Sequence, residues 1–73
     1  MTPERRQVID MLAELSDLGP EMRMGQWIAL FASLARGSQV ESIYDVEDEE
    51  LIPVMRAFLQ SRRAEASSRA KVG

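Results

Sequence analysis

Five carboxylates occupy six consecutive positions in the run Asp45-Val46-Glu47-Asp48-Glu49-Glu50, and this acidic run has the residue types best suited to chemistry. Its hard oxygen ligands would suit magnesium or calcium, but the run lacks the spaced Asp/Asn positions and the central glycine of an EF-hand loop. Acid–base catalysis would need a cleft that raises the pKa of one carboxyl. A chain of 73 residues has little depth to form one.

Two further interpretations of the acidic run remain open. The carboxylates could decorate the start of a helix, where the helix dipole favours negative charge. They could instead dock on a basic surface of another protein or imitate a phosphate backbone. We expect a protein-docking face, and its candidate residues are Asp45, Glu47, Asp48, Glu49 and Glu50.

Basic residues gather towards the C-terminus of the sequence, at Arg56, Arg62, Arg63, Arg69 and Lys71. Binding of nucleic acid through this end is the alternative function. No aromatic residue is interleaved with these cations, no recognition-helix pattern surrounds them, and the isoelectric point of the chain is near 4.8. Cations near the end of a helix also match the negative end of its dipole.

The chain contains neither cysteine nor histidine. Disulfides, thiolate nucleophiles, zinc sites of the usual kind and an imidazole base are therefore excluded. We predict no catalytic, cofactor-binding or metal-binding residue, and a protein that is not an enzyme. The N-terminal residues MTPERRQVID carry charges with no apolar h-region behind them, so we expect a cytoplasmic protein.

The apolar pattern predicts an all-α fold, a compact three-helix domain over residues 1–63, with helices at about 3–18, 21–36 and 47–63. Thr2 is a suitable N-cap, with Pro3 at the first helical position. Residues 37–46 should form an irregular connection that includes either a short extended piece or a single helical turn. Residues 64–73 should form a flexible tail, because the apolar pattern stops there. A domain this small gains from a homodimer or a bound partner.

The stretch 22–35, MRMGQWIALFASLA, is apolar around nearly the whole circumference of a helix. It is too short to cross a bilayer, which needs roughly 20 apolar residues. We expect this helix to lie between the other two and to pair with the first as an antiparallel hairpin. Gly25 costs helix stability, which suggests that another element packs against it. Ile43 and Tyr44 should dock on the Trp27 side.

The third helix has an ambiguous start, because several carboxylates could lie near its cap. Pro53 would delete a hydrogen bond in a helix interior, so a start near Glu47 or Asp48 is favoured.

The segments Arg23-Met24-Gly25-Gln26 and Tyr44–Leu51 make the chain resemble a group of small uncharacterised bacterial proteins over residues 12–60. These proteins have an R-x-G-Q segment followed by an aromatic residue shortly before D-E-E-L. The resemblance implies a compact helical domain and no particular activity. On physical grounds, Arg23 could pair with a carboxylate at 47–50, and Gln26 could bond the backbone before Tyr44. These three residues would then form a structural clasp between two helices.

Overall fold

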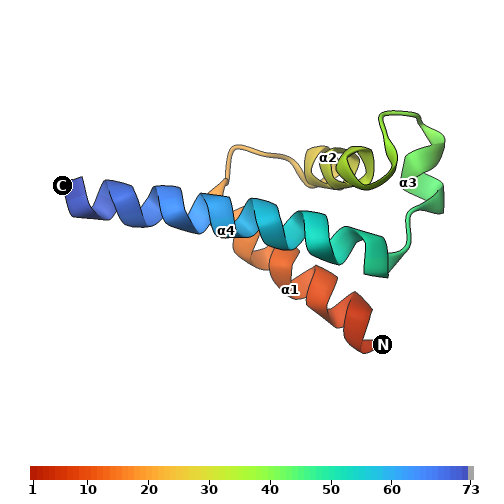
Figure 1. Cartoon of the computed structure of the whole chain (residues 1–73), viewed down its shortest axis with the longest axis horizontal. Helices are drawn as coiled ribbons and strands as arrows, with labels where there is room; N and C mark the ends of the chain where they lie inside the picture. Colours follow the sequence, from red (N-terminus) through yellow and green to blue (C-terminus); the bar gives the residue numbers. More distant parts are fainter. Residues whose placement is uncertain (73) are drawn as a thin grey trace.

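The fold is all-α, as the sequence predicts, and residues 1–72 form three long helices and one short one (Figure 1). The computed structural model describes the backbone of residues 1–72 and the side chains of residues 1–67. The helices are α1 (Pro3–Leu18), α2 (Met24–Arg36), α3 (Glu41–Asp45) and α4 (Asp48–Val72). The predicted bounds are correct for α1, whereas α2 begins later and α4 ends later than expected.

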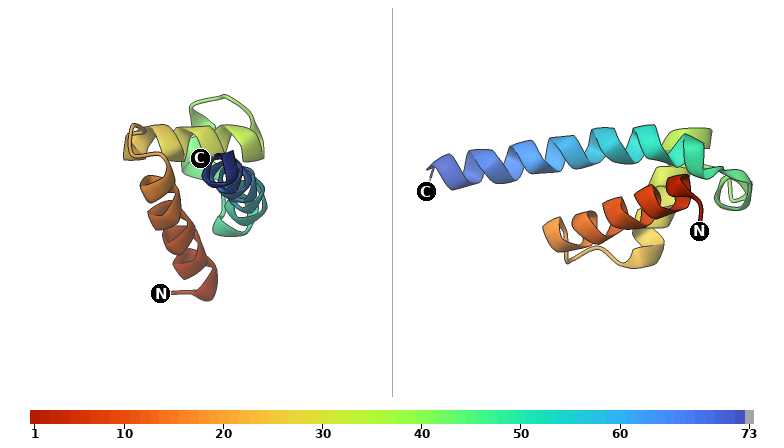
Figure 2. Two further views of the ribbon diagram at one scale, coloured as in Figure 1. Left: turned by 90° about the vertical axis from the view of Figure 1, so that its left-hand side faces the viewer. Right: turned by 90° about the horizontal axis from the view of Figure 1, so that it is seen from below.

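Helix α4 is the element on which both α1 and α2 pack, which corrects the expectation that the second helix lies between the other two. Helix α1 lies against α4 and runs in the same direction, and α2 crosses this pair (Figures 1 and 2). The connection 19–23 therefore does not produce the expected antiparallel hairpin of α1 and α2. The short helix α3 packs on α2 and leads into the start of α4.

Helix α1 begins as its sequence predicts, because the Thr2 Oγ1 accepts a hydrogen bond from the Arg5 N–H at 3.1 Å. Its apolar residues recur every three or four positions, and Val8, Met11 and Leu15 are buried. The helix closes at Gly19, whose N–H donates to the Leu15 carbonyl at 2.8 Å.

Helix α2 begins at Met24 because residues 20–22 form a turn and Arg23 takes an extended conformation. The side chain of Gln26 accepts a hydrogen bond from the Arg23 N–H at 2.7 Å, and this bond caps the helix start. The opposite end closes at Gly37, which has a φ of 99°. The Ser42 hydroxyl then donates to the Gly37 carbonyl at 2.8 Å and holds the following loop.

Helix α4 begins at Asp48, one of the two favoured starts, with Glu47 just before it. The Glu47 N–H donates to Glu50 Oε1 at 3.0 Å, which satisfies a backbone donor at the helix start. Pro53 lies inside the helix. Residues 47–50 therefore use part of their charge to build the helix terminus, as the dipole interpretation expects.

Helix α4 continues to Val72, past the predicted end near residue 63, and its last turns extend beyond α1 (Figure 1). Alanine, arginine and glutamate are good helix formers, and extending an existing helix costs much less than starting one. Arg62 and Glu65 add an ion pair at 3.9 Å one turn apart. The predicted tail was based on the loss of apolar spacing, which reports packing rather than helicity.

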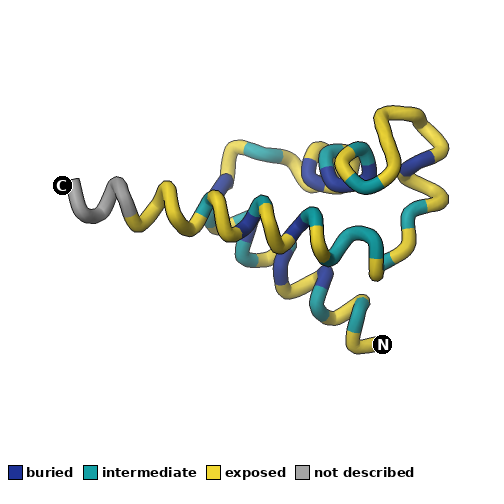
Figure 3. The backbone as a smooth tube through the Cα atoms, in the orientation of Figure 1, coloured by how far each residue is buried: buried dark blue, intermediate teal, exposed yellow. Residues whose placement is uncertain are grey.

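The buried residues of the hydrophobic core lie where α1, α2 and α4 meet (Figure 3). Trp27 and Phe31 stack with ring centroids 5.9 Å apart, and Phe58 of α4 meets both rings edge-on. Leu15 and Met55 are also almost completely buried. This aromatic cluster joins α2 to α4 and contains two of the largest fully buried side chains, Trp27 and Phe31.

Gly19, rather than Gly25, is the closely packed glycine. A Cβ atom at Gly19 would lie 3.0 Å from Cζ2 of Trp27, whereas a Cβ at Gly25 would meet nothing within 4 Å. The expectation that an element packs against Gly25 is therefore wrong. The connection after α1 needs glycine because the Trp27 ring lies against it.

Candidate interaction surface

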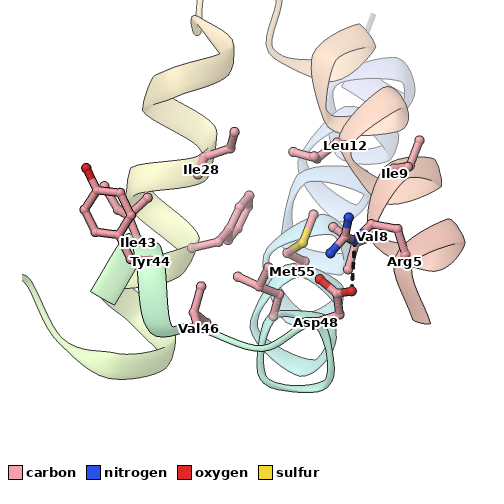
Figure 4. Close-up of a pocket in the computed structure, with 12 residues that line it drawn as sticks. Arg5, Val8, Ile9, Leu12, Ile28, Ile43, Tyr44, Val46, Asp48 and Met55 are labelled. Atoms are coloured by element: carbon pink, nitrogen blue, oxygen red, sulfur yellow. Dashed lines mark hydrogen bonds and ion pairs between the residues drawn. The ribbon is translucent and has the colours of Figure 1, made fainter. Parts of the chain in front are cut away.

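An open apolar groove lies between α1 and α2, with the first turns of α4 as its floor (Figure 4). Its volume is about 540 Å³. In Figure 4, Ile28 of α2 and Leu12 of α1 point towards each other across the opening. We call this feature the α1–α2 groove. Its twelve lining residues are Arg5, Val8, Ile9, Leu12, Ile28, Phe31, Ile43, Tyr44, Val46, Asp48, Leu51 and Met55.

The rim of the α1–α2 groove is formed by large apolar side chains that remain exposed. Ile9, Ile28 and Ile43 each keep between 42% and 44% of their surface exposed, and Tyr44 keeps 82%. Phe31 and Met55 form the floor and are buried in the core. Apolar side chains gathered around one opening are typical of a site that another molecule covers.

Polar groups in the groove come from Arg5, Tyr44 and Asp48. Arg5 Nε donates to Asp48 Oδ2 at 2.9 Å, and this ion pair connects α1 with the start of α4 (Figure 4). Because the remaining lining residues are apolar, the groove offers mainly a surface for aliphatic or aromatic side chains. The structure gives it no arrangement of nucleophile, base and oxyanion donors.

The predicted docking carboxylates separate into two sets. Asp48 pairs with Arg5, and Glu50 accepts two hydrogen bonds from Arg36, at 2.9 and 3.1 Å. The side chains of the second set are exposed and consist of Asp45, Glu47 and Glu49. The acidic run therefore both stabilises the fold and presents three carboxylates to solvent.

The exposed carboxylates belong to the segment 43–51, which forms one end of the α1–α2 groove, but none of the three lines it. Tyr44, Val46 and Asp48 line this end, and Asp45 and Glu47 alternate with them along the chain. Sequence reasoning found the charge of this segment but missed the groove beside it. The missed signal was on α2, whose apolar residues cover more of the helix than α4 alone can bury.

The predicted clasp of Arg23, Gln26 and Tyr44 is not present in the structure. Gln26 caps the Arg23 N–H within α2 and does not bond the backbone before Tyr44. Among the described side chains, no ion pair joins Arg23 to a carboxylate at 47–50. Arg36 takes that role through Glu50 and ties the end of α2 to the start of α4.

Tyr44 does not dock on the Trp27 side of α2, since its ring is almost fully exposed at the edge of the groove. Ile43 reaches the groove but remains partly exposed. The buried residue of the short helix α3 is instead Ser42, which precedes Ile43. The single helical turn among the two predicted possibilities is correct for this segment.

The basic end of the chain is partly used within the fold. The Arg63 guanidinium donates two hydrogen bonds to the Glu14 carboxylate of α1. Arg62 lies over the Phe58 ring, 5.2 Å from its centroid. The side chains of Arg69 and Lys71 lie outside the described residues.

Two carboxyls have a lowered pKa, and neither belongs to the exposed set. Hydrogen bonds from Arg63 lower the pKa of Glu14. Hydrogen bonds from Arg36, together with the Glu47 N–H, lower the pKa of Glu50. The same contacts raise the pKa of the two arginines. Perturbed titration here reports the ion pairs that connect the helices, not a reactive group.

Among the described side chains, no three carboxylates lie close enough to hold a metal ion. In the same part of the chain, no helix combines the length and the apolar composition needed to span a membrane.

No known protein family matches the chain, and comparisons with curated proteins and with solved structures found no match. The resemblance to small bacterial helical proteins therefore stays a prediction. The function has to be argued from the surface of the molecule.

Proposed function

We propose that this protein is a small, non-enzymatic, cytoplasmic interaction protein that binds a partner protein through the α1–α2 groove and the exposed carboxylates beside it. The observation that carries the proposal is an apolar opening rimmed by exposed Ile28, Ile43 and Tyr44, together with three exposed carboxylates in the chain segment 43–51 that forms one of its ends. Protein interfaces combine a buried apolar centre with a charged rim, and tyrosine is enriched in them.

Fewer residues of the acidic run are available to a partner than the sequence suggests. Asp48 and Glu50 hold α4 to α1 and α2, so their loss would remove contacts between helices as well as surface charge. Asp45, Glu47 and Glu49 are the carboxylates that can steer and orient a basic partner.

Nucleic-acid binding receives less support from the geometry. Arg62 and Arg63 contact Phe58 and Glu14 within the chain, and a phosphate would have to compete with the Glu14 carboxylate. The segment with the densest exposed charge is acidic, which repels a phosphate backbone.

The test compares affinity capture by the wild type with capture by D45N/E47Q/E49Q. The matched control is D10N/D17N/E21Q, which removes the same charge from exposed positions outside the groove. We expect a partner protein that is captured by the wild type and by the control but is not captured by D45N/E47Q/E49Q. Each candidate partner is then purified and its direct binding measured at two salt concentrations, because screening should weaken contacts to exposed carboxylates.

A partner lost equally with both triple variants would indicate a general charge effect and contradict the proposed site. Direct binding that nucleic acid alone reproduces, with a steep salt dependence, would instead favour the alternative function.

A further inference from the structure

The α1–α2 groove resembles a helical bundle from which one helix is missing. Helices α1 and α2 form its two walls, and α4 forms its floor (Figure 4). Leu12 and Ile28 face each other across the opening instead of packing together. A further helix laid over Met55 would contact all three elements and cover the exposed rim.

An extended peptide fits this groove less well than a helix. A strand needs partners for its backbone N–H and C=O groups, and it finds them at the free edge of a sheet. Residues 1–72 contain no strand, and the helical walls already use their backbone groups internally. An α-helix satisfies its own backbone bonds and presents only side chains, which is what an apolar groove can accept.

Charge indicates what kind of helix this would be. The end of the groove near Tyr44 belongs to residues 37–54, which contain six carboxylates and no basic residue. Of these carboxylates, Glu41 is exposed on α3, and Asp45, Glu47 and Glu49 are exposed in the acidic run. A helix that carries lysine or arginine at this end would be complementary to them.

A second copy of this chain is a poorer occupant. The connection 19–23, towards the opposite end of the groove, contains Glu21 and Arg23 and so offers no net positive charge to a partner's acidic end. The basic part of α4 does not offer an aliphatic face, because its described residues after Leu59 are polar or alanine. Two grooves pressed together would also leave both acidic segments unmatched.

We propose that the α1–α2 groove binds an amphipathic α-helix of another protein, with the aliphatic face of that helix over Met55 and a lysine or arginine beside Asp45, Glu47 and Glu49. This inference rests on the proposed function and specifies its partner. The 13 residues of α2 span roughly 20 Å at the usual helical rise. Because α2 lines the groove only through Ile28 and Phe31, a partner segment of similar length to α2 is long enough to cover it.

The experiment uses a displayed library of random peptides of about 16 residues, enough to follow α2 along its length. The library is selected on the full wild-type chain and counter-selected on Ile28→Asp. Leu34→Asp is the matched control, because Leu34 is also about half exposed on α2, at 54% against 43% for Ile28, but does not line the groove. Circular dichroism first establishes that both variants are folded.

The expected result is enrichment of peptides with apolar residues at i, i+3, i+4 and i+7 and basic residues towards one end. Their affinity should fall more than about tenfold with Ile28→Asp and remain unchanged with Leu34→Asp. The affinity of the same peptides should fall by a smaller factor with D45N/E47Q/E49Q, and their binding to this variant should no longer depend on salt. Changes in the NMR chemical shifts of backbone amides on peptide binding should occur in α1, α2 and the start of α4.

Enriched peptides without helical periodicity, or without basic residues, would overturn the inference. Absence of enrichment would also overturn it. If gel filtration then showed a dimer that Ile28→Asp dissociates, a second copy would be the occupant. Failure of this inference is distinguishable from failure of the proposed function, because affinity capture tests the proposed function separately. A partner lost with D45N/E47Q/E49Q but kept with D10N/D17N/E21Q would still support docking of a protein, one that is not helical at this site.

Discussion

The two faces of α2 contain the same class of residue and have different surroundings. Trp27 and Phe31 are 1% exposed against the aromatic ring of Phe58, whereas Ile28 and Met24 are 43% and 51% exposed. Helix α4 covers the first face, and nothing in the described chain covers the second. The comparison separates the apolar residues that build the fold from those that remain available to a partner.

The largest expected difference between the two faces is in stability. Trp27→Ala removes a ring that stacks on Phe31 and meets Phe58, and should lower the free energy of unfolding by about 3–5 kcal/mol. Ile28→Ala removes a half-exposed side chain and should change it by less than about 1 kcal/mol. Urea denaturation followed by circular dichroism measures both. Equal losses would mean that the groove face also belongs to the core.

A second, smaller difference concerns two glycines, Gly19 directly after α1 and Gly25 in the first turn of α2. Gly19→Ala places a Cβ 3.0 Å from the Trp27 ring, and overpacking of this kind should cost about 1–3 kcal/mol. Gly25→Ala meets no neighbour and should stabilise α2 by up to about 1 kcal/mol. Thermal denaturation of the two variants beside the wild type measures opposite shifts. Shifts of the same sign would contradict the packing of Trp27 on Gly19.

The smallest effect should come from the exposed ion pairs around the core. The pKa of Glu14 and that of Glu50 are both lowered from 4.5 in the folded state. These pairs therefore stabilise the fold at a pH above about 4.5, and their contribution is lost as the pH falls through the folded-state pKa. At pH 7 the melting temperature of E14Q/E50Q should be lower than that of the wild type. On acidification to pH 3 the melting temperature of E14Q/E50Q should fall by less than that of the wild type.

The control for this pH experiment is D10N/D17N, which removes two exposed carboxylates of α1 that form no ion pair among the described side chains. The control should follow the wild type on acidification. If it behaves like E14Q/E50Q, general charge repulsion rather than the two ion pairs controls the acid sensitivity.

Local features of the fold could be predicted from the sequence because they depend on neighbouring residues. Thr2, Pro3 and the spacing of Val8, Met11 and Leu15 determine α1, and the predicted bounds agree with the structure. The later start of α2 also has a local cause, since Gln26 three residues after Arg23 is a capping signal. That signal was present in the sequence and was not used.

Tertiary features were harder to predict because residue spacing gives the apolar face of a helix but not its neighbour. The continuous apolar stretch of α2 suggested a helix buried between two others. The structure instead leaves one face of α2 uncovered and makes α4 the common partner. The groove could not be found from single segments, since α1, α2, α3 and α4 all contribute to it.

The candidate site was predicted in part. The acidic run was identified, but spacing alone could not show that Asp48 and Glu50 would pair with Arg5 and Arg36. These partners are distant in the sequence, and exposed ion pairs leave little trace in composition. The predicted clasp was wrong for the same reason, because several arginines could reach the start of α4.

The measurement that tests the central claim most directly combines stability and partner capture on Ile28→Asp, with Leu34→Asp as its control. Both variants should unfold within a few degrees of the wild type, since both positions are about half exposed. Leu34→Asp should also retain the partner captured by the wild type, and Ile28→Asp should lose it. Retention of that partner by a folded Ile28→Asp protein would contradict the claim that the α1–α2 groove is the binding site.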